Sequence, residues 1–278
     1  MRNTCGTVVG MEYKTNVHFH SSEDPEDVIS YSLYEGIDHA ASLGFQVLAS
    51  TTHARCVVTD DHRAYAEARG MLLISGMEAN VYDEGARRFS HVLILNCDRS
   101  AEAVRTFADL AAYRASHPEC FTIAPHPYFY GNFSLKQRLT QYIDLFDAIE
   151  QSWFYTKYLN RNLRAEAVAR MSGKPFISTS DTHYFDFMDT NYTLIEAEGL
   201  SCAAIFEAIR AHRYTNVTSP RTPADVGTFI IRACGLEFRK LMRTLRPVNT
   251  HLPVVPSLEP TRVCVRTDER TGTRHPHE

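Results

Sequence analysis

Residues 15–22 read TNVHFHSS, a β-rich run that carries two histidines at its end. Side chains at positions i and i+2 of a strand point to the same face and lie about 7 Å apart. His18 and His20 are therefore spaced so that both imidazoles can converge on one ion. This segment predicts a first strand whose carboxyl end opens onto a metal site.

Short β-rich runs and longer helical patterns alternate along the rest of the chain. Such alternation predicts parallel strands joined by crossover helices, and the number of units fits a closed α/β barrel better than a three-layer open sheet. The first helix is expected to follow a cap residue at Asp24, with Pro25 at its first position. The expected strands span residues 15–20, 46–51, 72–75, 91–95, 121–124, 147–150, 176–179 and 192–195, and the expected helices span residues 25–43, 60–69, 101–116, 135–145, 157–171 and 202–212.

Candidate metal ligands follow these strands. In an α/β barrel the carboxyl ends of the strands form a single rim, where active sites are built. One histidine beside a strand is more often structural, but H-x-H at one strand end and D-x-H at another favour a functional site. His91 instead begins the strand SHVLIL, so either that strand runs differently or the side chain reaches the site from a bend. The other candidates are His53 after VLAST, Glu78 after LLISGM, His126 after FTIAP, and Asp181 and His183 after FISTS; Glu150 ends a strand and fits a ligand role or a supporting role equally well.

The order and spacing of these motifs resemble the polymerase-and-histidinol-phosphatase (PHP) family. The resemblance spans about residues 14–220 and includes AIFEAIRAHRYTNV (204–217), which resembles the closing helix of the family. It implies a distorted seven-stranded α/β barrel that holds up to three divalent metals, commonly manganese, iron or zinc. The segments that carry it are HFH (18–20), STTH (50–53), GME (76–78), SHVLIL (90–95), APHP (124–127), IEQSWFYTKYLNRN (149–162) and SDTH (180–183).

The resemblance also implies how each metal is held and which residues take part in catalysis. The third metal would take His53, His183 and an acidic residue or a histidine from the loop after His20. Catalysis would depend on His183 together with the four ligands of the first metal, which are His18, His20, Glu78 and Asp181. The first metal would bind His18, His20, Glu78 and Asp181, and Glu78 would bridge to a second metal completed by His91 and His126.

Two departures from the family pattern concern the third metal. The loop after His20 is the short SSEDPED, so Asp24 or Glu23 has to stand in as the ligand, although Asp24 is also expected to cap the first helix. The second motif of the family is usually Thr-Asp-His, and Thr52 stands where the acid is expected.

Composition narrows the class of protein. The chain has 278 residues, 44% of them apolar, which is enough for a substantial core without disulfides. The net charge of −4 lacks the basic excess of a binder of long nucleic acid and favours a small substrate or a short nucleic-acid end. Seven scattered cysteines without a C-x-x-C pair indicate reduced thiols. With no signal-peptide pattern and no apolar run that could span a membrane, a cytoplasmic location without a membrane partner is expected.

The chain is expected to divide into three parts. Residues 1–221 form the barrel, and residues 222–246 form one more amphipathic helix that packs on it. Residues 247–278 are rich in Pro, Thr and Arg and are expected to form an extended or disordered tail.

The expected activity is hydrolysis of a phosphate monoester, from a small metabolite or a nucleotide, by water that two or three divalent ions activate. The alternatives are a 5′-end exonuclease on short nucleic acid, an amidohydrolase-type metallohydrolase, and an inactive PHP domain that serves as a binding module. Six aromatic residues after the fifth and sixth strands either stack on the substrate or roof the barrel; they are Tyr128, Phe129, Tyr130, Trp153, Phe154 and Tyr155. The expected phosphate-binding residues, in loops after strand ends, are Arg55, Arg88, Lys157 and Arg161.

Overall fold

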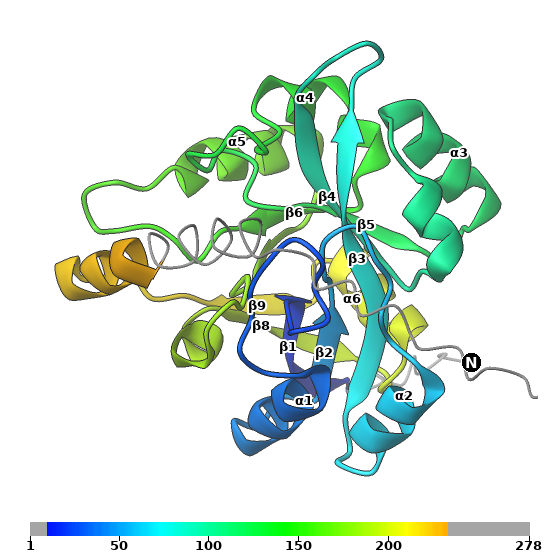
Figure 1. Ribbon diagram of the computed structural model, residues 1–278, viewed down its shortest axis with the longest axis vertical. Coiled ribbons are helices and arrows are strands. Elements are labelled where there is room, and N and C mark those ends of the chain that lie inside the picture. Colours follow the sequence, from blue (N-terminus) through cyan, green and yellow to red (C-terminus); the bar gives the residue numbers. More distant parts are fainter. Residues whose placement is uncertain (1–9, 233–278) are drawn as a thin grey trace, which may run out of the picture.

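The computed structural model describes residues 10–232, and a single nine-stranded sheet curls into a nearly closed barrel at its centre (Figure 1). The strands lie in the order β7-β6-β5-β4-β3-β2-β1-β8-β9. β1, β2 and β3 run parallel to one another, as do β5, β6 and β7. The strands are β1 (Met11–Phe19), β2 (Val47–Ser50), β3 (Leu72–Tyr82), β4 (Phe89–Leu95), β5 (Phe121–Ala124), β6 (Ala148–Gln151), β7 (Phe176–Ser178), β8 (Tyr192–Ala197) and β9 (Tyr214–Val217).

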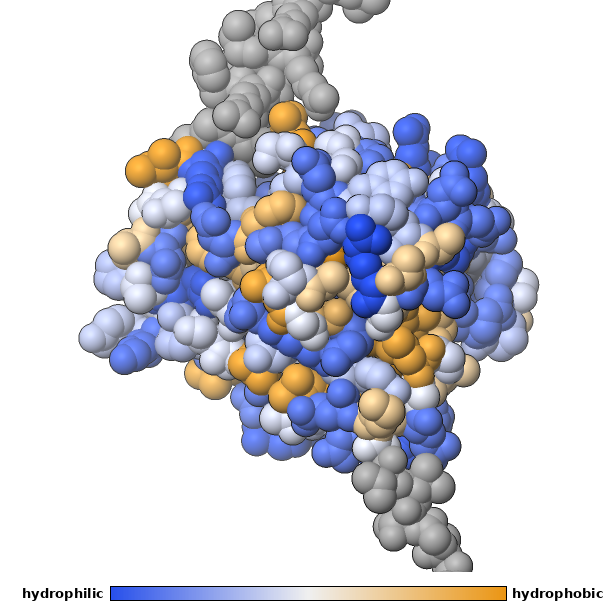
Figure 2. Space-filling view, turned by 90° about the horizontal axis from the view of Figure 1, so that it is seen from below, coloured by the Kyte–Doolittle hydropathy of each residue, from blue (hydrophilic) through white to orange (hydrophobic). Residues whose placement is uncertain are grey.

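Helices surround this barrel, and one more helix covers residues 223–232 (Figure 1). Seen from below, the surface is mostly hydrophilic, and its apolar patches are small and separated by polar side chains (Figure 2). Within residues 10–232 no helix combines the length and apolar character needed to cross a membrane. The helices are α1 (Leu33–Ser42), α2 (Asp60–Glu67), α3 (Phe107–Ser116), α4 (Gln137–Gln141), α5 (Asn162–Ser172) and α6 (Cys202–Arg210), with 3-10 turns η1 (Arg99–Ala103), η2 (Ile143–Leu145) and η3 (Phe185–Thr190).

Apolar side chains from strands all round the barrel fill its interior. α6 closes the interior at the end where the strands begin. Its Phe206 stacks on Phe121, the first residue of β5, with ring centroids 4.6 Å apart, and its Arg210 binds Asp147, just before β6. Two further apolar clusters lie outside the sheet, one under α1 and α2 and the other under α3, α4 and α5. The carboxyl ends of the parallel strands therefore remain free to form a site.

β1 contains a β-bulge that aims a side chain at this free end. Asn16 pairs with Leu48 and Phe19 pairs with Ser50, so β1 has one residue more than β2 between these pairs. As a result, two consecutive residues face the interior: Val17 joins the apolar cluster, and His18 lies above it among polar side chains. Bulges are common beside active sites because they redirect a side chain in this way.

Side chains, rather than a backbone ladder, close the barrel between β7 and the pair formed by β8 and β9. Ser178 N donates to Asn216 Oδ1 at 2.9 Å, and Asn216 Nδ2 donates to Phe176 O at 2.7 Å. At the rim, His20 N donates to Thr182 O and Thr182 N donates to His18 O, both at 3.1 Å. The segment after β7 is thereby fixed directly beside the end of β1.

Replacing Asn216 with alanine should therefore open this seam. The change removes the donor to Phe176 O and one of the two acceptors of Ser178 N, which keeps Thr193 Oγ1. We therefore expect a loss of roughly 1–3 kcal/mol in the free energy of unfolding. Urea unfolding followed by circular dichroism would measure the loss. Thr215→Ala, on the exposed side of the same strand, is the matched control. Equal stability of the two variants would contradict the role given to Asn216.

The structure corrects the expected strand count and direction. The sheet has nine strands rather than seven, and β4, β8 and β9 run antiparallel to their neighbours. β9 was missed because its short run YTNV follows α6 directly and was assigned to the closing helix. The antiparallel direction of β4 settles the position of His91, which pairs with Asn80 on β3 and so reaches the rim from the start of its strand.

The first helix also begins later than expected. The prediction placed its start at Pro25 with Asp24 as the cap, but α1 starts at Leu33. Its cap is Ser32, whose hydroxyl accepts from the backbone of Glu35 while the Glu35 carboxylate accepts from Ser32 N. The preceding residues form a loop in which Asp24 Oδ1 accepts from the backbone of Glu26 and Asp27 while its Oδ2 faces His20 and His53.

The predicted C-terminal helix over 222–246 is described only as far as residue 232. The remainder of that helix, and the predicted tail at 247–278, lie outside the described residues. The division of the chain into three parts stays a prediction.

Candidate metal centre

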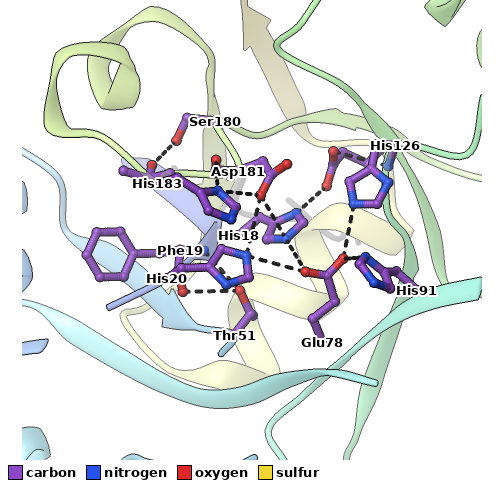
Figure 3. Close-up of polar contacts among 12 residues, drawn as sticks. His18, Phe19, His20, Thr51, Glu78, His91, His126, Ser180, Asp181 and His183 are labelled. Carbon is purple, nitrogen blue, oxygen red and sulfur yellow. Dashed lines mark hydrogen bonds and ion pairs between the residues drawn. The ribbon is translucent and has the colours of Figure 1, made fainter. Parts of the chain in front are cut away.

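Polar side chains from the barrel wall converge at the carboxyl ends of the parallel strands (Figure 3). His53 is held beside β3 because Ala54 N donates to Glu78 O at 2.8 Å and Glu78 N donates to Thr52 O at 3.1 Å. All the side chains of this group are buried or half-buried. The group comprises His18 and His20 at the end of β1, His53 after β2, Glu78 in β3, His91 in β4, His126 after β5, Glu150 in β6, and Asp181 and His183 after β7.

Glu78 lies at the centre of the group, with only 1% of its surface exposed. Its Oε2 is 3.2 Å from His18 Nε2, 3.3 Å from His20 Nε2 and 3.2 Å from His53 Nε2. Its Oε1 is 2.6 Å from His91 Nδ1 and 3.0 Å from His126 Nε2. The two oxygens therefore face different sets of imidazoles, as expected of a carboxylate shared between two cations.

Asp181 completes the side of the group nearest β1. Its Oδ1 is 3.3 Å from His18 Nε2, 3.4 Å from His20 Nε2 and 3.4 Å from His183 Nδ1. Glu150 lies behind, with Oε2 2.7 Å from His18 Nδ1 and Oε1 accepting from the backbone N–H of His126 at 3.2 Å. Because Glu150 engages Nδ1 of His18, Nε2 of that ring is directed towards Glu78 and Asp181. Carboxylates commonly orient metal-binding histidines in this way.

The loop after His20 supplies two aspartates. Asp24 Oδ2 is 2.9 Å from both His20 Nδ1 and His53 Nδ1, so both rings present Nε2 to Glu78. The ligand atoms of His20, Asp24 and His53 lie within 4.8 Å of one another. Asp27 Oδ2 is 2.8 Å from His183 Nε2 and 3.9 Å from His53 Nδ1.

Asp27 was missed in the sequence because it was expected inside a helix, although it belongs to the SSEDPED loop that was searched for a ligand. Glu23, the other residue considered in that loop, instead accepts a hydrogen bond from the backbone of Leu33 at the start of α1. The loop therefore brings Asp24 and Asp27 to the group and leaves Glu23 outside it.

Two of the candidate ligands have unusual backbone conformations. The φ angles of His126 and Asp181 are +28° and +43°, a region that residues other than glycine rarely occupy. Such conformations are concentrated at functional sites, where the surrounding fold imposes them.

The residues present fit a divalent metal cluster. Among the described side chains, His20 Nε2, His91 Nδ1 and Asp181 Oδ1 are buried atoms without a hydrogen-bond partner. Each of these atoms lies within 3.4 Å of another candidate ligand atom, but the geometry does not form a hydrogen bond. A buried polar atom without a partner is costly, and a cation between these atoms would satisfy them. Imidazole and carboxylate ligands together suit zinc, iron or manganese.

Several solved structures have a similar fold. A two-domain protein from Bacteroides vulgatus, described as containing a predicted PHP-like metal-dependent phosphoesterase, is 19% identical with a TM-score of 0.55 over 75% of this chain and 65% of that protein. PsfC from Pseudomonas syringae is 14% identical with a TM-score of 0.53 over 83% of this chain and 99% of that protein. The lesion-specific endonuclease PfuEndoQ from Pyrococcus furiosus is 14% identical with a TM-score of 0.51 over 72% of this chain and 56% of that protein.

These likenesses concern the fold alone, and this chain spans less than two thirds of the Bacteroides and Pyrococcus proteins. No curated protein sequence matches it. A family model described as PHP-associated matches residues 160–214, from just before α5 to the start of β9. Residues 160–214 therefore resemble the PHP-associated family, and the fold resembles that of a protein described as PHP-like. The nine strands of this barrel and its antiparallel β4 are a variation within the expected fold class.

The electrostatic balance of the site keeps Glu78 ionised. Burial alone would raise the pKa of Glu78, but His91, His18 and His53 outweigh it and hold that pKa well below its usual range. Burial would likewise lower the pKa of His18, yet Asp181, Glu150 and Glu78 raise it to about 10. His91 is the exception, because burial dominates and lowers its pKa to about 4. Its ring stacks on Phe89 and Phe133 and stays neutral near pH 7.

This balance predicts that metal binding releases protons. Without metal, the raised pKa of His18 keeps it protonated up to about pH 10, whereas a ligand imidazole must be neutral. The affinity for manganese or zinc should therefore rise with pH, by about tenfold per pH unit for each proton released. Titration calorimetry between pH 6.5 and 8.5, in buffers of different ionisation enthalpy, would count the protons. An affinity that does not change over this range would contradict the prediction.

A pocket of about 430 Å³ opens directly onto the site. The carboxylates and imidazoles form one wall, and Glu26 and Asp27 lie at its edge. In the part of the chain that the structure describes, no arginine or lysine lines this pocket. Its other wall is aromatic and consists of Phe89, Phe129, Phe133, Trp153, Tyr184, Phe187 and Phe229.

The four expected phosphate-binding residues thus lie away from this pocket. Arg55, Arg88 and Lys157 are exposed outside it. Arg161 lines a neighbouring pocket, where its guanidinium lies 3.8 Å from the centre of the Tyr130 ring. The direction in which a loop turns after a strand is not encoded in the spacing of its charges, so sequence alone could not place these side chains.

Proposed function

We propose that this protein is a metal-dependent phosphoesterase of the PHP family that hydrolyses a phosphate monoester. The observation that carries the proposal is the position of Glu78, whose Oε2 faces His18, His20 and His53 while Oε1 faces His91 and His126. A carboxylate with that environment can hold two cations side by side. Adjacent divalent cations suit in-line displacement at phosphorus better than most other hydrolyses.

Two or three divalent ions of manganese, iron or zinc would activate water and neutralise the phosphoryl oxygens. The chain itself positions the ligands, since Glu150 orients His18 and Asp24 orients both His20 and His53. His183 is the most accessible imidazole of the group, with 22% of its side chain exposed, and it lines the pocket while binding Asp27.

The pocket gives less support to the alternative of a 5′-end exonuclease. Binding of a nucleic-acid backbone depends on lysine and arginine contacts to successive phosphates. The described lining of the pocket includes Glu26 and Asp27 but no lysine or arginine. A substrate with one phosphoryl group, neutralised by the metals, fits these charges better.

The test is the metal content of the full-length protein, purified mildly, together with its activity on a generic aryl phosphate. We expect bound transition metal, turnover that a chelator abolishes, and recovery of turnover on adding manganese. Amide and lactone panels should give no comparable activity, which separates this proposal from an amidohydrolase. Protein without metal that shows no turnover after manganese is added would overturn it, and bound metal without activity on any ester would indicate a binding module.

A further inference from the structure

The aromatic wall facing the metal centre indicates the chemistry of the substrate beyond its phosphoryl group. Resting on the proposed phosphoesterase function, we infer that the substrate is the phosphate monoester of an uncharged aromatic alcohol of low polarity. The inference names the leaving group that the pocket binds.

The charges around the pocket are the first support. The phosphoryl group would be neutralised at the metal centre, where the imidazoles would also be engaged. Any second anionic group would share the pocket with Glu26 and Asp27 and would find no lysine or arginine among the described lining residues. A buried charge without a partner is strongly unfavourable. The part of the substrate outside the phosphoryl group should therefore carry no negative charge.

The shape and surface of the pocket are the second support. Phe129, Phe133, Phe187 and Phe229 line the pocket together with the candidate ligands, and the Phe133 ring stacks on His91 with centroids 4.7 Å apart. Aromatic side chains bind a planar ring through offset or edge-to-face contacts. A volume of about 430 Å³ is within the range of pockets that enclose a small organic molecule.

A second pocket extends the aromatic surface away from the metals. It has a volume of about 520 Å³ and shares His126, Phe129 and Phe229 with the first. Phe229 lies in the helix at residues 223–232, and it contacts Trp153 and Phe154 with ring centroids 5.4 and 4.7 Å apart. This helix therefore forms a wall common to both pockets, and a bicyclic leaving group has room to extend along it.

The reaction conserves atoms and charge without any co-reactant other than water. Water forms the new P–O bond, and the bond between phosphorus and the oxygen of the aromatic alcohol breaks. One proton of the water is transferred to the departing oxygen. The products are the free alcohol and inorganic phosphate.

The test compares monoesters whose leaving groups have similar acidity, so that intrinsic reactivity does not decide the outcome. The metal-loaded full chain is assayed with 2-naphthylmethyl phosphate, benzyl phosphate, glycerol 3-phosphate and phosphocholine. We expect kcat/KM for 2-naphthylmethyl phosphate to exceed that for glycerol 3-phosphate by at least about tenfold. Equal efficiency for glycerol 3-phosphate, or preference for phosphocholine, a nucleoside 3′,5′-bisphosphate or an oligonucleotide, would overturn the inference.

Variants of the common wall test the same point. Phe229→Ala should raise KM for 2-naphthylmethyl phosphate by about threefold to tenfold, a larger increase than for glycerol 3-phosphate. Ile231→Ala is the matched control, because Ile231 lies in the same helix with 74% of its surface exposed. An equal effect of Phe229→Ala on both substrates would count against ring binding.

A binding measurement separates failure of this inference from failure of the proposed function. 2-Naphthylmethylphosphonate, which cannot be hydrolysed, should bind the metal-loaded protein at least about tenfold more tightly than methylphosphonate. Tight binding without hydrolysis of any ester would uphold the pocket assignment and overturn the phosphoesterase function. Equal binding of the two phosphonates, with ester hydrolysis intact, would overturn the pocket assignment and uphold the phosphoesterase function.

Discussion

Replacing Glu78 with glutamine is expected to lower phosphate-ester hydrolysis by about 10³-fold or more. The five imidazoles around this carboxylate lie between 2.6 and 3.3 Å from its oxygens, so both oxygens are needed. An amide keeps one oxygen and turns N–H donors towards rings that must also face cations. Metal content should fall with activity, and both are measured on the same preparation.

The control for this variant is Glu12→Gln, which makes the same chemical change at an exposed position of β1. It should retain full activity and full metal content. Thermal unfolding of both variants shows whether the barrel survives. A Glu78→Gln protein that keeps its metals and most of its activity would contradict the central place given to this residue.

Replacing Asp181 with asparagine is the second large effect, with an expected loss of about 10²- to 10³-fold in activity. Asparagine tolerates positive φ better than most residues, so the backbone at +43° should be retained while the charge is lost. Asp181 Oδ1 approaches three imidazoles, and the amide can no longer balance their charge. Steady-state kinetics with manganese, compared with thermal unfolding of the metal-free form, separates lost chemistry from lost folding.

Asp144→Asn, on the exposed turn η2, is the matched control and should behave as the unmodified protein does. Recovery of Asp181→Asn activity at high manganese concentration would show that the residue acts by holding metal. Unchanged activity at limiting manganese would contradict a ligand role for Asp181.

Much of the fold and of the candidate site was predictable from sequence because both depend on local patterns. An apolar β-run followed by a histidine or carboxylate fixes the element and its position at the barrel rim together, as for His18 and Asp181. The structure brings all nine of the expected ligand residues, His18, His20, Asp24, His53, Glu78, His91, His126, Asp181 and His183, into the vicinity of one site. Their assignment as ligands stays a proposal.

The features that sequence could not provide depend on competition between distant groups. Asp24, Pro25 and two acids form a good helix start, and Asp24 Oδ1 does accept from the backbone of Glu26 and Asp27. Its Oδ2 faces His20 and His53, however, and the helix begins only at Leu33. The direction of β4 depends on its pairing with β3 and β5, which no local pattern encodes. Asp27 was overlooked for the same reason, since its partner His183 is 156 residues away.

The bulge in β1 makes Val17 and His18 consecutive residues on the inner wall of the barrel. The apolar interior and the polar layer above it therefore meet between these two consecutive residues. Small rearrangements below this boundary would be transmitted to the imidazoles without any intermediate layer to absorb them. We therefore expect occupancy of the metal sites and rigidity of the barrel to change together. A cavity created deep in the interior should lower the affinity for the ions.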